Sequence, residues 1–226
     1  MRNVTKFEWA FLAFALVYSF IPAVLPFVRV SELLGGPIIM PPNPRAINEP
    51  VPIVLHILAS AIFCLAGAVQ FLPSLRRTRP ALHRGLGRLV AAAGCVSALT
   101  GLWMTVFYVF PSALQGPLLY WARVVLSIAM VAAIVWAVVA IRARNIAAHR
   151  AAMLRTYAIG QGAATQTALF IAGMALFGAE PSGFSRDVLM VAAWVINLVI
   201  AEAIIRHADL ARPTRAVDKP AARPAP

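Results

Sequence analysis

Acidic residues and charged residues in general are scarce in this chain of 226 residues. Eight Asp and Glu stand against twenty Lys and Arg, and only 12% of residues are charged. Hydrophobic residues make up 61% of the chain, more than a soluble domain of this length could bury. The shortage of charge therefore excludes an ordinary soluble domain and indicates a protein embedded in a membrane.

The motifs of several enzyme classes are also missing. The chain has no Gly-rich phosphate loop, no HExxH and no GxSxG. Glu202 is the only acid well inside an apolar stretch, which excludes a paired-carboxylate site. The two cysteines, Cys64 and Cys95, lie inside apolar stretches without metal-binding spacing, so we expect them to pack as small apolar side chains. The sequence leaves open whether any metal binds.

Six apolar stretches are long enough to cross a hydrocarbon core, which takes roughly 20 helical residues. They predict an all-α polytopic membrane bundle in one domain, residues 1–210, with a four-helix core formed by the second to fifth spans. Pro22 and Pro26 should kink the first span, which is too long for a cleaved signal. The Pro-, Ala- and Arg-rich tail, 211–226, should be disordered. The expected spans are 8–29, 51–72, 87–110, 118–142, 152–177 and 187–206.

The basic residues collect at alternate gaps between these stretches. Sixteen of the twenty fall on one side, and positive residues stay cytoplasmic, so both termini should be cytoplasmic. We expect this side to contact anionic lipid head groups, and the runs lack the interleaved aromatic residues of a nucleic-acid interface. No oligomer or partner subunit is specified. The sixteen are Arg2, Lys6, Arg76, Arg77, Arg79, Arg84, Arg88, Arg142, Arg144, Arg150, Arg155, Arg206, Arg212, Arg215, Lys219 and Arg223.

Two His-Arg pairs begin equivalent spans on the basic side, His83-Arg84 and His149-Arg150. One interpretation is a haem b held by both histidines, with the arginines on its propionates. His56, near the outer end of the second span, would then need an outer partner such as Met104 or Met174. The other interpretation is that both pairs anchor helix ends to lipid phosphates.

Other polar side chains inside the spans should face the bundle interior, because unpaired polar groups are costly in lipid. Glu202 should pair with Arg155 or Arg88. Asn197 is expected to hydrogen-bond to the fifth span, where Gln161, Thr165, Gln166 and Thr167 form a polar stripe, and Gln70 ends the second span. Arg123 either extends to the outer interface or lines an outer pocket with His56 for an anionic head group or a quinone oxygen.

Three motifs carry a resemblance to a known family. QFLPSLRRTRPALHRGLGRL (70–89), HRAAMLRTYA (149–158) and WVINLVIAEAIIR (194–206) resemble the signatures of the bacterial membrane family called domain of unknown function 2306. His56 also fits, whereas Ala152 stands where an aromatic residue is usual. The resemblance covers about residues 50–206 and implies a multi-helix protein of the bacterial cytoplasmic membrane. It implies no reaction.

Two functional classes follow from these features. The first is a membrane redox protein that holds haem b or quinone among the second to fifth spans. The second is a non-enzymatic protein: a small transporter, a lipid-interacting protein or an accessory subunit. Helix breaks at matching places in two halves would favour transport. The second to fifth spans contain no such breaker, so we expect them to be unbroken.

Overall fold

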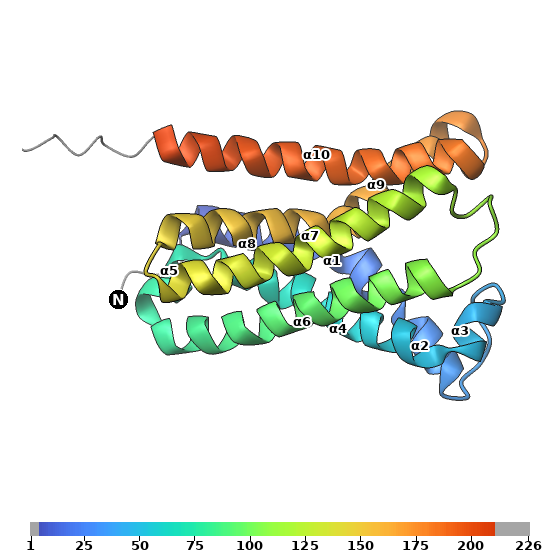
Figure 1. The fold of residues 1–226 in the computed structure, drawn as a ribbon, viewed down its shortest axis with the longest axis horizontal. Helices are drawn as coiled ribbons and strands as arrows, with labels where there is room; N and C mark the ends of the chain where they lie inside the picture. The colour runs from blue at the N-terminus through green and yellow to red at the C-terminus, as the bar shows by residue number, and fades with distance from the viewer. Residues whose placement is uncertain (1–4, 211–226) are drawn as a thin grey trace, which may run out of the picture.

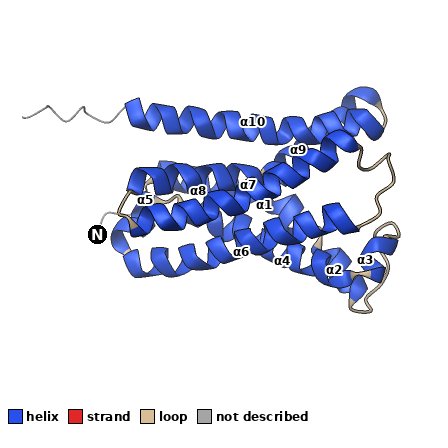
Figure 2. Cartoon of the chain, viewed as in Figure 1, coloured by secondary structure: helices blue, strands red, loops and turns tan. Residues whose placement is uncertain are grey.

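The structure of the protein is a computed structural model that describes residues 5–210, and all regular elements in that range are helices (Figures 1 and 2). Arg2 and the tail 211–226, predicted to be disordered, lie outside the described residues. In chain order the helices are α1 (Lys6–Val24), α2 (Phe27–Leu33), α3 (Pro44–Asn48), α4 (Pro50–Gln70), α5 (Pro73–Thr78), α6 (Pro80–Phe107), α7 (Pro117–Arg142), α8 (Ile146–Gly160), α9 (Gly162–Phe177) and α10 (Gly183–Leu210).

Within residues 5–210, five helical segments are long and apolar enough to cross a membrane. The fifth expected span, 152–177, does not form one such helix, because a turn at Gln161 divides it into α8 and α9. The expectation that this span would be unbroken is therefore wrong. The five segments are Glu8–Leu33, Pro50–Gln70, Pro80–Phe107, Pro117–Arg142 and Gly183–Ala208.

The long helices lie side by side along the longest axis of the molecule (Figure 1). We call the end that carries α5 and the α7–α8 turn the basic end, and it is at the left of Figure 1. The opposite end, which carries α2, α3 and the α6–α7 and α9–α10 connections, is the loop end. The first span is interrupted by a turn at Leu25 and Pro26, in agreement with the predicted kink.

The core lies among α4, α6 and α7, with α8 packed against it. Phe63 of α4 is 1% exposed and lies in a slot between two glycines. A Cβ at Gly94 of α6 would be 2.7 Å from the Phe63 ring, and one at Gly160 of α8 would be 2.5 Å from it. Three helices can therefore approach the same ring only because both positions lack a side chain. Cys64 and Cys95 are free thiols packed against this core.

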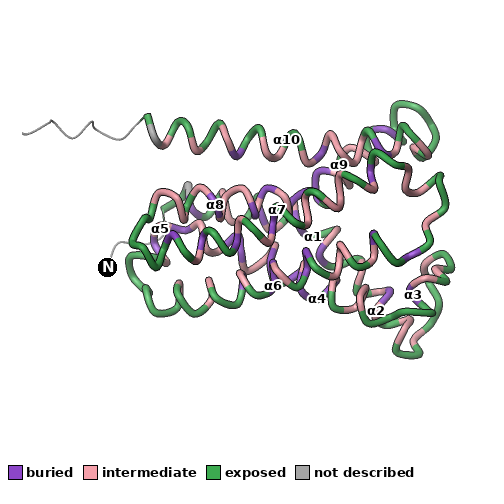
Figure 3. Tube along the Cα trace, in the orientation of Figure 1, coloured by how far each residue is buried: buried purple, intermediate pink, exposed green. Residues whose placement is uncertain are grey.

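The perimeter of the bundle is apolar, and Figure 3 shows buried positions mainly along the inward faces of the central helices. Val17 of α1, Val125 of α7 and Val199 of α10 are all more than half exposed. A bundle that is hydrophobic on its outside as well as its inside is typical of helices surrounded by lipid.

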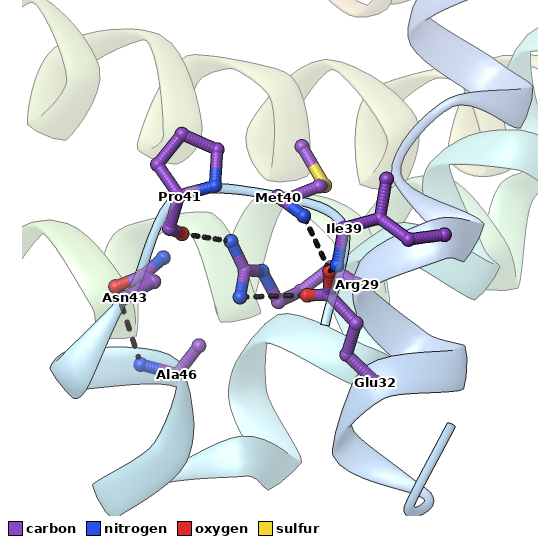
Figure 4. Close-up of polar contacts among 7 residues, drawn as sticks. All are labelled: Arg29, Glu32, Ile39, Met40, Pro41, Asn43 and Ala46. Carbon is purple, nitrogen blue, oxygen red and sulfur yellow. Dashed lines mark hydrogen bonds and ion pairs between the residues drawn. The ribbon is translucent and has the colours of Figure 1, made fainter. Parts of the chain in front are cut away.

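An ion pair and several hydrogen bonds connect α2 to the segment that follows it at the loop end, within residues 31–50 (Figure 4). Arg29 and Glu32 of α2 form a buried ion pair at 2.7 Å. Glu32 Oε1 accepts hydrogen bonds from the backbone N–H groups of Ile39 and Met40, and Arg29 donates to the carbonyl of Pro41. These contacts join α2 to the following loop, and the segment also contains the short helix α3.

Glu8 joins the start of α1 to the basic end. Its carboxylate closes a capping box with Thr5, and it also accepts a 2.7 Å hydrogen bond from the backbone N–H of Ser74 in α5. One side chain therefore satisfies free N–H groups at the starts of two helices.

Candidate functional site

A cavity of about 670 Å³ lies in the half of the bundle nearest the loop end. Its walls come from α1, α4, α6, α7, α8, α9 and α10, and most of the lining is apolar. The polar groups in the walls include two of the residues singled out from the sequence, His56 and Arg123. A mostly apolar cavity with a few convergent polar groups is the usual form of a small-molecule site.

His56 projects from the first two turns of α4 toward α6. Its Nδ1 lies 2.9 Å from the carbonyl oxygen of Ser97, and its ring packs on Gly101, where a Cβ would be 3.2 Å from the imidazole. A carbonyl only accepts, so Nδ1 carries a proton, and in the neutral form of the ring the lone pair is on Nε2. Small residues on α6 thus bring a histidine into the cavity in one defined tautomer.

Arg123 enters the same cavity from α7, within Coulombic range of His56. Its Nη1 donates to Gln115 Oε1, and its guanidinium carbon is 5.4 Å from the centre of the Phe110 ring. Among the described residues no carboxylate lies within ion-pair distance of Arg123. The sequence left open whether Arg123 extends to the interface or lines a pocket with His56, and the pocket arrangement is the one found.

The cavity reaches the lipid-facing surface between α1 and α9. Its walls include Ile21 of α1, Leu25 in the turn after α1, and Ile171 and Met174 of α9, each about half exposed or more. At its rim Arg186 forms a 3.0 Å ion pair with Glu180 and lies over the ring of Phe170. An amphipathic molecule could therefore enter from the bilayer with its polar head toward His56 and Arg123.

The break between α8 and α9 forms part of the cavity wall and is stabilised by α10. Trp194 Nε1 donates to the carbonyl of Ile159 at 3.1 Å, and Asn197 Nδ2 donates to that of Ala158 at the same distance. These carbonyls lie at the end of α8, where the α-helical partners are lost. The predicted bond from Asn197 to the fifth span is therefore confirmed, and it satisfies backbone groups that the break sets free.

The polar stripe of the fifth span continues from this break into α1. Gln161 Nε2 donates to Ser19 Oγ at 2.9 Å, and Thr165 bonds both Asn197 and the hydroxyl of Tyr18. Gln166 donates to the carbonyl of Met190 and also lines the cavity. The stripe thus joins α1, α9 and α10 by hydrogen bonds, and no sequence pattern predicted that α1 takes part.

Glu202 of α10 pairs with Arg155 of α8, one of the two partners expected from the sequence. Two contacts join the side chains, and Arg155 Nη2 lies 2.9 Å from Glu202 Oε2. The side chains are 42% and 37% exposed, so the pair lies at the surface of the bundle rather than in its interior.

His83 and His149 lie in the first turns of α6 and α8, both at the basic end. His149 Nδ1 is 2.9 Å from the carbonyl oxygen of Ala137, and His83 is within Coulombic range of His149 and Arg84. The side chains of Arg84 and Arg150 are exposed, and the 670 Å³ cavity reaches neither histidine. No three His, Cys, Asp or Glu side chains gather as a metal site in residues 5–210.

Asp187 is a buried residue whose role the sequence did not reveal. It is 1% exposed, and its carboxylate accepts hydrogen bonds from the N–H groups of Gly116 and Leu119 at the start of α7. It caps α7 from α10 and thereby positions the start of the helix that carries Arg123. No local pattern predicts a cap supplied by another helix.

One known protein family matches the chain. The model of the family described as predicted membrane protein, DUF2306, matches residues 53–205. The chain belongs to this family. The match confirms the resemblance carried by the three sequence motifs, and it includes His56, His83 and His149. No curated protein and no solved structure matches the chain.

Proposed function

We propose that this DUF2306 protein binds a quinone-type lipid in the cavity at the loop end and takes part in membrane redox chemistry. The observation that carries the proposal is the pairing of His56 and Arg123 in one largely apolar cavity that reaches the lipid-facing surface. A quinone matches both properties, because it has an apolar tail and two carbonyl oxygens that accept hydrogen bonds. Arg123 supplies a fixed donor, and the free Nε2 of His56 can take up and donate a proton.

The membrane placement that goes with this function is a multi-pass protein of the bacterial cytoplasmic membrane, with six crossings and cytoplasmic termini. The asymmetry of sixteen basic residues among twenty supports this orientation. The sixth crossing would be made by α8 and α9 together, since their break is satisfied by Trp194 and Asn197 and needs no water. The cavity would then lie in the outer half of the bilayer.

Haem b in the same cavity is the second candidate. Met104 and Met174 line the cavity with His56, as a His–Met ligand pair would require. A haem held by His83 and His149 is supported less, because Arg84 and Arg150 are exposed and Arg150 lines only a crevice of about 20 Å³.

A non-enzymatic role as a small transporter, a lipid-interacting protein or an accessory subunit remains the alternative class. A broken helix beside a cavity occurs in carriers, which usually have a matching break in the other half. The counterpart of α8–α9 in the first helical hairpin is α6, which is continuous from Pro80 to Phe107. This asymmetry does not favour alternating access.

The test is to purify the protein in mild detergent, extract it with organic solvent and measure quinone by mass spectrometry. A visible spectrum of the same sample reports haem. We expect bound quinone in the parent protein and at least about tenfold less in Arg123→Gln, the loss expected for one hydrogen bond to a charged group.

Arg45→Gln is the matched control for this experiment. Arg45 also lies over the ring of Phe110, at 4.6 Å, but it is not part of the cavity wall. It should keep the quinone. A haem absorption band without quinone would support the second candidate, and a protein with neither ligand would reject redox binding at this site.

A further inference from the structure

Two buried polar atoms at the basic end have no hydrogen-bond partner among the described residues. They are Nε2 of Gln70, the last residue of α4, and Nδ1 of His83 in the first turn of α6. Leaving such a group unpaired is costly, so native structures usually supply a partner from protein, water or ligand. The positions of these atoms indicate which kind of partner is missing.

Both side chains lie on one face of α6. The Gln70 amide lies against α6 at Gly87, where an added Cβ would be 3.3 Å from Gln70 Oε1. Gly87 is four residues after His83, so the two positions share one face of the helix. Gln70 therefore packs on the same face of α6 that carries His83.

The surroundings of this pair are cationic. His83 is within Coulombic range of Arg76, Arg84 and His149. Neither Arg76 nor Arg84 forms an ion pair in the described part of the chain. The ion pairs found there join Glu32, Glu180 and Glu202 to other arginines. Glu8, the acid joined to α5, is engaged by Thr5 and Ser74.

We propose that Gln70, His83 and Arg76 form a binding site for a phosphate-type anion at the basic end of the bundle. The Gln70 amide nitrogen can only donate, so what it lacks is an acceptor. A phosphate oxygen is a strong acceptor, and the surplus of arginines stabilises its charge. The site is separate from the cavity that holds His56, and it does not depend on a quinone ligand.

The same chemistry can come from the phosphodiester of an anionic phospholipid or from free phosphate. The test uses the full chain in phosphatidylcholine nanodiscs, with phosphatidylglycerol added in one arm and inorganic phosphate in another. Thermal midpoints and native mass spectrometry report binding. If the thermal midpoint rises with phosphatidylglycerol but not with inorganic phosphate, the ligand is a lipid head group. If it rises equally with inorganic phosphate, the ligand is a free anion. Either result supports the site.

Arg76 and Arg77 provide a matched pair of variants, because both are exposed and adjacent in α5 and Arg76 is the one assigned to the site. Arg76→Gln should weaken anion binding about tenfold, the effect of losing one charge-assisted contact. Arg77→Gln removes the same charge and should leave binding nearly unchanged. Equal weakening by both variants would mean diffuse surface attraction and would overturn the proposal, as would a lack of binding in both arms.

Gln70→Met gives a second test, in which the substitution should raise the thermal midpoint instead of lowering it. Without an added anion this variant should have a higher thermal midpoint than the parent protein, because it removes an unpaired amide and keeps the volume. With the anion it should lose the anion-dependent rise. A lower midpoint without the anion would show that Gln70 already has a partner within the protein, and the site would then be rejected.

Discussion

Arg155 of α8 and Glu202 of α10 form a two-pronged ion pair, with Arg155 Nη2 2.9 Å from Glu202 Oε2. It ties the last helix to the bundle near the basic end. The pair is 42% and 37% exposed, so its contribution to stability is that of a partly screened pair.

Replacing Glu202 by Leu should lower the free energy of unfolding by about 1 kcal/mol, the upper range for exposed ion pairs. This is less than a buried pair would lose, because water or lipid head groups can solvate the unpaired Arg155. Glu202→Gln should cost less than Glu202→Leu, since the amide oxygen still accepts from the guanidinium. Thermal unfolding in detergent measures both.

Glu180→Gln serves as the control for this experiment. It breaks the ion pair with Arg186 at the loop end, where Glu180 is 65% exposed. Its effect should be the smallest of the three. A loss of several kcal/mol in Glu202→Gln would contradict the screened pair and indicate a buried one.

Gly160→Ala should destabilise the protein by about 1–3 kcal/mol, the usual range for overpacking. The new Cβ would be 2.5 Å from the Phe63 ring, which is held from the other side by Gly94. Adding Phe63→Leu to Gly160→Ala should restore part of the loss. Equilibrium or thermal unfolding of the single and double variants gives the coupling.

The control for the glycine slot is Gly85→Ala. Gly85 lies in α6 with no atom within 4 Å of an added Cβ, and alanine has the better helix propensity. Stability should stay the same or rise. If Gly85→Ala and Gly160→Ala behave alike, the slot around Phe63 does not limit the packing of α8.

The long helices could be predicted from the sequence because apolar length and basic connectors are local properties. The break at Gln161 could not, because no Pro marks it and Gly160 and Gly162 also have packing roles. What stabilises the break is the side chains of Trp194 and Asn197, more than thirty residues away. A backbone break in lipid depends on such distant partners, which no sequence window contains.

The candidate site was predictable to a similar degree. His56 and Arg123 could be singled out because a polar side chain inside a membrane span is energetically costly and usually has a functional role. Their meeting in one cavity depends on Gly101, which admits the His56 ring, and on Asp187, which fixes the start of α7. Both are contacts between different helices. The sequence identifies the residues but not which helices they bring together.

Trp194→Phe should destabilise the protein by about 1 kcal/mol, the scale of interhelical hydrogen bonds in membrane proteins. The change keeps an aromatic ring but leaves the carbonyl of Ile159 without its 3.1 Å donor. Trp136→Phe is the control, because Trp136 is 58% exposed on α7 and should tolerate the change. Thermal unfolding and protease resistance near residue 161 report the effect. If both variants are equally stable, the Trp194 bond does not hold the break.

The basic end should face the cytoplasm, and the alternation of connectors allows this to be tested at several points. The α6–α7 connection is at the loop end, where Ala113 accepts a hydrogen bond from Gly183, and the α7–α8 turn carries Arg142 and Arg144 at the basic end. Alkaline phosphatase, which is active only outside the cytoplasm, should be active when fused after Ala113 and silent when fused after Ala143. A fusion after Phe177 should be active as well, since α8 and α9 together must then cross the bilayer. Activity after Ala143 would reverse the orientation, and silence after Phe177 would mean that the broken helix enters the membrane and returns to the same side.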